Sequence, residues 1–141
     1  MKNSSLSIAI FAILFIGGCK SSASDEVIAK DMCGCFNMIK DSIPAEALPV
    51  FSKAAVADDP KETYSKEMQK LNPETTKKLV AALMLTTKAG SPISNCLNEM
   101  DKKYKTTEKD ELVMAQRMVD ALKKNKDCDI MLSLMRINLK K

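Results

Sequence analysis

The sequence predicts an all-α fold, a single compact bundle of six or seven short helices stapled by disulfide bonds. Apolar residues recur at three- and four-residue spacings along the chain after residue 24, the pattern of helices that bury one face. No run of β-branched residues alternates with polar ones at the period of two that strands show. Three capping residues each stand directly before a proline, as at many helix beginnings.

Apolar stripes predict the first two helices. The stripe of the first, over residues 25–40, consists of Ile28, Met32, Cys35, Phe36 and Ile39. The stripe of the second, over residues 46–57, consists of Leu48, Phe51, Ala55 and Val56. We expect both stripes to face a common core.

Three capping pairs predict the next three helices, over residues 60–71, 73–88 and 92–105. The pairs are Asp59-Pro60, Asn72-Pro73 and Ser91-Pro92, and a proline fits the first helical turn because its missing N–H is not needed there. Glu62 follows Asp59 at the capping-box spacing. Gly90 predicts that the helix before it ends at Lys88. The expected core residues of these helices are Tyr64, Met68, Leu71, Leu79, Val80, Leu83, Met84, Ile93, Cys96, Leu97, Met100 and Tyr104.

The last two helices are predicted over residues 108–124 and 128–139. Thr107 and Asp110 stand at the capping-box spacing before the first of them. Its stripe consists of Leu112, Ala115, Val119 and Leu122. The final helix has apolar residues on two faces, namely Cys128, Met131, Leu132, Met135 and Leu139, then Ile130, Leu134 and Ile137. We therefore expect it to be the most buried element.

The N-terminus has the pattern of an export signal. Lys2 supplies a positive charge, and an apolar run extends from Leu6 to Ile16. The run is shorter than the roughly 20 residues that a membrane-spanning helix needs. The sequence then continues Ile16-Gly17-Gly18-Cys19.

These residues resemble the lipobox of bacterial lipoprotein precursors, which is an aliphatic residue, two small residues and a cysteine. The resemblance implies cleavage before Cys19 and attachment of acyl chains, such as palmitate, to Cys19. The expected organisation is a signal peptide over 1–18, a lipidated cysteine and polar tether over 19–24, and one helical domain over 25–141. Two or three acyl chains hold a protein stably to a membrane.

The resemblance also implies a location. In enterobacterial lipoproteins an aspartate after the lipidated cysteine favours the inner membrane, so Lys20 favours the outer membrane. Asp25 and Glu26 resemble the acidic surface-export signal of Bacteroidota lipoproteins, although they come late after Cys19. We expect a lipid-anchored protein of the cell envelope, on the periplasmic face of the outer membrane or on the cell surface.

Composition excludes several kinds of chemistry. The chain has no histidine, which removes Ser–His–Asp and Cys–His catalysis, His-ligated zinc hydrolysis and covalent c-type haem. Carboxylate catalysis would have only scattered candidates such as Glu62, Glu67 and Asp110. The net charge is +4 and tryptophan is absent. Lysines are interspersed with acids, for example after Glu74, Glu99 and Asp120, which is typical of a solvated surface rather than of a nucleic-acid interface.

Four cysteines remain after Cys19, namely Cys33, Cys35, Cys96 and Cys128. An even number in an exported chain is first interpreted as two disulfides. Residues two apart on a helix point about 200° apart, so Cys33 and Cys35 should join different neighbours. Cys35 lies in the middle of the apolar stripe and Cys33 on its flank. We expect the pairs Cys35–Cys96 and Cys33–Cys128, although a Cys33–Cys35 bridge stays open if Gly34 breaks the helix.

A soft-metal site is the alternative for these sulfur atoms. The Cys33-Gly34-Cys35 pair and the methionines, of which the chain has ten, could bind Cu(I) or zinc. Most methionines lie on the apolar stripes, where methionine is an ordinary core residue. A redox dithiol is less favoured because the Cys-x-x-Cys spacing is absent. We therefore expect no metal and no cofactor.

The cysteine pattern as a whole resembles small helical Cys-x-Cys lipoproteins of Bacteroidota, many of which have no known function. The resemblance implies no catalytic residue. The leading hypothesis is a non-enzymatic lipoprotein held to the membrane through Cys19 and binding a protein partner in the envelope. The alternatives are a carrier of an apolar small ligand and a soft-metal or thiol-redox protein that uses Cys33, Cys35, Cys96 and Cys128.

Overall fold

A computed structural model describes residues 23–104, 111–125 and 127–139 of the chain. These residues form seven α-helices and two short 3-10 helices, with no strand among them. The elements are α1 (Asp25–Asn37), η1 (Lys40–Ser42), η2 (Ala45–Ala47), α2 (Leu48–Val56), α3 (Pro60–Met68), α4 (Pro73–Met84), α5 (Pro92–Lys103), α6 (Glu111–Leu122) and α7 (Asp129–Leu139). Two disulfides link them. The predicted all-α, disulfide-stapled fold is confirmed.

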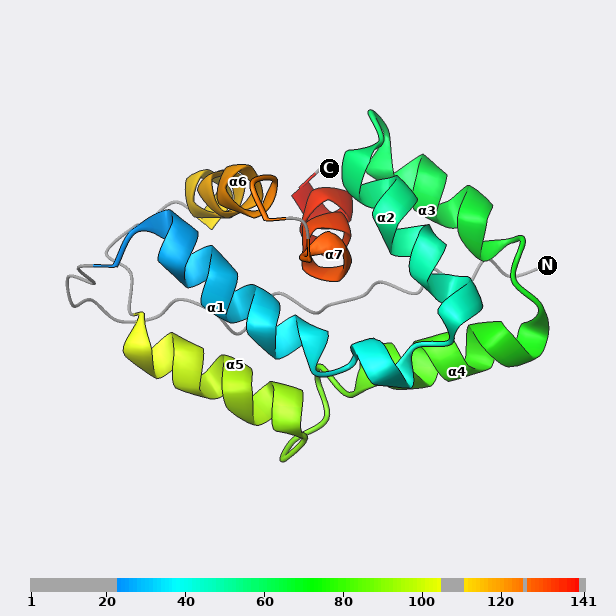
Figure 1. The fold of residues 1–141 in the computed structure, drawn as a ribbon, viewed down its shortest axis with the longest axis horizontal. Coiled ribbons are helices and arrows are strands. Elements are labelled where there is room, and N and C mark those ends of the chain that lie inside the picture. Colours follow the sequence, from blue (N-terminus) through cyan, green and yellow to red (C-terminus); the bar gives the residue numbers. More distant parts are fainter. Residues whose placement is uncertain (1–22, 105–110, 126, 140–141) are drawn as a thin grey trace.

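Helix α7 lies in the centre of the bundle (Figure 1). On one side of it α1 and α5 run antiparallel to each other, with α6 packed on α1. On the other side lie α2 and α3, and α4 follows the edge beside η1 and η2. Six consecutive residues of α7, 130–135, are buried. This run confirms that the last helix is a central element.

Three of the predicted capping residues begin their helices as expected, and the fourth, Thr107, lies outside the described residues. Asp59 accepts a hydrogen bond from the backbone N–H of Glu62 at 2.9 Å, and Asn72 accepts one from Thr75 at 2.8 Å. Ser91 accepts one from Ser94 at 3.1 Å. Each cap satisfies an N–H group that has no partner within its own helix.

The folded domain begins slightly earlier than expected. Ser24, which the sequence analysis assigns to the tether, is the N-cap of α1 and accepts a hydrogen bond from the N–H of Val27. Ala23 is partly buried and packs against the core. Both residues therefore belong to the folded domain, and the tether expected from the sequence would be correspondingly shorter.

Helix α4 ends at Met84 rather than at the predicted Lys88. Beyond it the hydroxyls of Thr86 and Thr87 donate hydrogen bonds to the carbonyls of Leu83 and Met84, at 2.7 and 3.2 Å. Threonine side chains compete in this way for carbonyls that would otherwise continue the helix. Gly90 has a φ of 77° in the turn that leads to α5, a conformation that glycine adopts without strain.

Three residues expected in the core are exposed instead. Val56, Met84 and Leu112 retain 79%, 64% and 67% of their accessible surface. Val56 and Met84 are the last residues of their helices, where the core no longer covers them. The residues of α6 that are buried in the core are Met114, Met118, Val119, Ala121 and Leu122. The predicted stripe of this helix was therefore wrong at its first position.

Candidate functional site

The predicted lipidation site lies outside the described residues. The lipobox-like residues 16–19 precede Ala23, where the described chain begins, and Asp110 lies in the second undescribed segment. Among the described residues, no helix has both the length and the apolar character to cross a membrane.

Helix α1 carries both halves of the Cys-x-Cys pair and continues unbroken through Gly34. Cys33 is bonded to Cys128 at the start of α7, with a Cα–Cα distance of 5.4 Å. Cys35 is bonded to Cys96 of α5, with a Cα–Cα distance of 5.6 Å. Helical geometry predicts that Cys33 and Cys35 join different neighbours, and the two bridges accordingly join α1 to the start of α7 and to α5.

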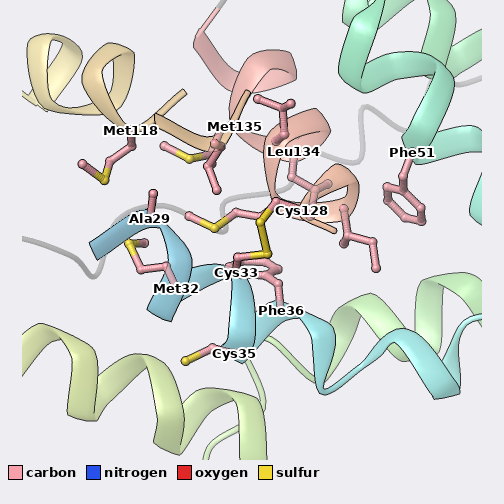
Figure 2. Close-up of a cluster of buried hydrophobic side chains, with 14 of the residues drawn as sticks. Ala29, Met32, Cys33, Cys35, Phe36, Phe51, Met118, Cys128, Leu134 and Met135 are labelled. Carbon is pink, nitrogen blue, oxygen red and sulfur yellow. A yellow bond between two sulfur atoms is a disulfide. The ribbon is translucent and has the colours of Figure 1, made fainter. Parts of the chain in front are cut away.

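The surroundings of the first bridge differ from the expectation. The sequence places Cys33 on the flank of the helix, yet Cys33 and Cys35 are both buried, at 3% and 0% exposure. Figure 2 shows the Cys33–Cys128 bridge in the space between α1 and α7, close to Phe36. Cys33 is buried because α6 and α7 cover the side of α1 that a single-helix stripe leaves open.

The sulfur atoms of the four cysteines and of six methionines have structural roles. Each of the four cysteines is in a disulfide, and a disulfide sulfur offers no thiolate to a metal. In the described parts of the chain, no group of three or more cysteine, aspartate or glutamate side chains could hold a metal ion. Six methionines are core residues, namely Met32, Met100, Met114, Met118, Met131 and Met135.

The carboxylates considered for catalysis are held in ion pairs. Glu62 contacts Lys66 at 2.7 Å. Glu67 contacts Lys53 at 2.8 Å and also Lys70. Hydrogen bonds from Lys53, which has the larger effect, and from Lys70 hold the pKa of Glu67 below its usual range. A general acid must carry a proton near neutral pH, and Glu67 is held ionised instead.

A polar cluster joins α1 to α5 near the Cys35–Cys96 bridge. The hydroxyl of Tyr104 and the ammonium of Lys103 both donate to one carboxylate oxygen of Asp31, the second at 2.9 Å. These two hydrogen bonds hold the pKa of Asp31 below its ordinary value, and the bond from Tyr104 has the larger effect. The Lys103 ammonium also lies 4.7 Å from the centre of the Tyr104 ring. The cluster therefore fixes the geometry of two helices.

Two further ion pairs join α1 to α6 and to the turn that follows it. Arg117 donates two hydrogen bonds to the carboxylate of Asp25, at 2.8 and 2.9 Å. Lys124 donates to Glu26. From the sequence, the lysines that follow Glu99 and Asp120 are expected on a solvated surface. Two of them, Lys103 and Lys124, pair with residues of α1, while Asp120 pairs with Lys123 at 3.1 Å.

A pocket of about 450 Å³ lies between the end of α2 and the start of α7. Its lining is Ala55, Val56, Lys123, Asn125, Asp129, Leu132 and Arg136. The Arg136 guanidinium donates to the carbonyls of Ala55 and Ala57 at 2.6 and 2.7 Å, so it caps the end of α2. Four of the seven lining residues are polar or charged. This composition does not favour an apolar ligand, whose pocket is predominantly hydrophobic.

No protein-family model matches the chain, and neither a curated protein nor a solved structure matches it. The function is therefore inferred from the sequence signal and from the geometry of the domain.

Proposed function

We propose that the protein is a lipid-anchored binding domain of the bacterial cell envelope, attached through Cys19 and without a catalytic role of its own. The observation that carries the proposal is the Ile16-Gly17-Gly18-Cys19 lipobox, which stands a few residues before a folded helical domain. Lys20 favours the outer membrane by resemblance to enterobacterial lipoproteins.

The two disulfides support an exported location. Disulfides persist in oxidising compartments such as the periplasm and the cell surface, and they are rare in the cytosol. Here all four cysteines that follow the lipobox are in bridges. An export signal and a disulfide-linked domain are consistent features of one envelope protein.

The ionisable side chains favour a role without catalysis. The chain contains no histidine. Asp31, Glu62 and Glu67 are each held by cations. Salt-bridged carboxylates of this kind stabilise a fold or meet a partner, and they are poorly suited to exchange protons at neutral pH.

The anchor is tested by replacing the proposed lipidation site. Wild-type protein expressed in a Gram-negative host should incorporate labelled palmitate and fractionate with the outer membrane. Cys19→Ala should lose the label and accumulate as the uncleaved precursor, because the thioether cannot form. Ser21→Ala is the matched control and should behave as wild type. A Cys19→Ala protein that is processed and labelled would contradict the proposal.

The binding role is tested on the anchored protein. Wild-type protein is purified from envelopes solubilised in several detergents, and a partner that co-purifies is then rebound to the purified protein at defined concentrations. A saturable complex supports the proposal. Failure to recover a partner under every condition counts against a binding role and leaves the anchor untouched.

A further inference from the structure

We infer that the end of the domain at which α1 begins lies against the phospholipid bilayer, with Val27 in contact with the headgroup region. The inference rests on the proposed lipid anchor and adds an orientation to it. It follows from the length of the tether, the apolar residues at this end and the way in which its acidic residues are paired.

The tether is too short to hold the domain away from the membrane. Ala23 packs against the core and Ser24 caps α1, so only residues 20–22 separate the lipidated cysteine from the folded domain. From Cys19 to Ala23 an extended chain spans at most about 14 Å. The acyl chains place Cys19 at the bilayer surface. The first turn of α1 therefore stays close to the headgroups whatever the tilt of the domain.

Apolar side chains are exposed at this same end. Val27, in the first turns of α1, retains 47% of its accessible surface. Leu112 and Val113, at the start of α6, retain 67% and 46%. Figure 1 shows that α1 begins, α5 ends and α6 begins at one end of the molecule, on the left of the view. Exposed apolar residues beside a lipid anchor gain by burial in the headgroup and acyl boundary.

The acidic residues at this end would otherwise be repelled by anionic lipids, and each is paired. All three acidic side chains of α1 contact a cation on α5, on α6 or in the turn that follows α6. The pairs are Asp25 with Arg117, Glu26 with Lys124, and Asp31 with Lys103. Lys30 is exposed on the same helix, three residues after Val27. Lysines near an anionic surface are attracted to it, so the charges favour a lipid surface as the occupant of this end.

The test uses a tryptophan placed on the proposed contact. The chain has no tryptophan, so Val27→Trp creates a unique fluorophore. Val56→Trp is the matched control, because Val56 is also an exposed helical valine and belongs to α2, which lies on the other side of α7 from α1. Lipidated full-length mature protein is reconstituted into phosphatidylethanolamine–phosphatidylglycerol vesicles, with and without brominated acyl chains.

Emission from Val27→Trp should shift to shorter wavelength on the vesicles and lose most of its intensity with brominated lipid. Emission from Val56→Trp should change little. Both variants should melt as the wild type does, because both positions are exposed. Equal quenching of the two variants, or no quenching of Val27→Trp on protein that floats with the vesicles, would overturn the orientation and favour a protein partner at this end. Protein that does not float would instead overturn the anchor.

The wild-type chain supplies an independent readout. A membrane-impermeant amine reagent should modify Lys30 more slowly when the lipidated protein is on vesicles than when detergent has dissolved them. Lys61, exposed in the first turn of α3, should react at the same rate in both states. Equal protection of the two lysines would contradict the inferred orientation.

Discussion

Asp31 shows how a single side chain links two helices. Its two donors, Lys103 and Tyr104, are adjacent in the chain, and adjacent residues of a regular helix point about 100° apart. They converge on one carboxylate because α5 ends between them, with Tyr104 at φ −116° and ψ 45° as its C-cap. From the sequence this helix is predicted to extend to residue 105, and Tyr104 is expected only as a core residue. Tyr104 is buried, as expected, and also supplies a hydrogen bond.

Replacing Tyr104 by phenylalanine should make the fold less stable in a pH-dependent way. The pKa of Asp31 is lowered in the folded state, so its contribution is present above the unfolded pKa and is lost as the pH falls through the folded pKa. Tyr104→Phe should lower the free energy of unfolding by about 1 kcal/mol at pH 7, since the Asp31 carboxylate is partly exposed and screened. Below the folded pKa of Asp31 the difference from wild type should shrink.

Urea unfolding of both proteins across a pH series measures this difference. Tyr64→Phe, which removes a hydroxyl from the ring that packs on Phe51, is the control and should change stability equally from neutral to acidic pH, where the Tyr64 hydroxyl stays protonated because burial raises its pKa. A Tyr104→Phe deficit that stays constant into acid would mean that the hydroxyl acts through packing and not through the ionised carboxylate.

At the scale of elements, Ser91 connects the end of one helix to the start of the next. Its hydroxyl oxygen accepts from the N–H of Ser94 at 3.1 Å, and its O–H donates to the carbonyl of Leu85 at 2.6 Å. It therefore caps α5 and also satisfies a carbonyl just beyond α4. Ser91 is buried, whereas Asp59, the cap of α3, is exposed. A buried capping residue with two hydrogen-bond partners should contribute more to the stability of the fold than an exposed capping residue.

Ser91→Ala should accordingly lower the free energy of unfolding by about 2 kcal/mol, and Asp59→Ala by about 1 kcal/mol. The larger loss follows because the Leu85 carbonyl would remain without its donor in a poorly hydrated place. Urea unfolding of the two variants side by side provides the comparison. Equal losses would show that water replaces the serine hydroxyl at no cost.

Helix beginnings were predictable because their signals are local. Asp59, Asn72 and Ser91 each act within three residues of the sequence, and the structure begins a helix after each. The end of α4 was missed because Thr86 and Thr87 satisfy carbonyls by side-chain hydrogen bonds, which periodicity does not detect.

The features of the candidate site also differ in whether the local sequence could predict them. The pairing of Cys33 and Cys35 with different helices follows from a local angle. The contacts of Asp31 with Tyr104 and of Arg136 with Ala55 join residues 73 and 81 positions apart. Such contacts depend on how the helices pack, which no single stripe of apolar residues specifies. The polar pocket beside Arg136 was unpredicted for the same reason.

At the scale of the whole molecule, covalent links are unevenly distributed. Both disulfides join α1 to other elements, namely α7 and α5. No cysteine lies between Cys35 and Cys96 in the sequence, so α2, α3 and α4 are held by packing and hydrogen bonds. Arg136 of α7 reaches across to the last carbonyls of α2. Helix α3 has one buried residue, Pro60, whereas α7 has six buried residues.

This asymmetry predicts unequal local stability. In native-state hydrogen exchange, amides of α3 should exchange fastest among the helices and amides of α7 and α1 slowest, because regions with few buried contacts open at lower free energy. Arg136→Ala should speed exchange at the end of α2 and in α3 while α1 keeps its protection, since two hydrogen bonds to the α2 carbonyls are lost. Arg117→Ala is the matched control and should act on α1 and α6, where Arg117 holds Asp25. A uniform acceleration of all helices by either variant would show that the two sides of α7 open together as one cooperative unit.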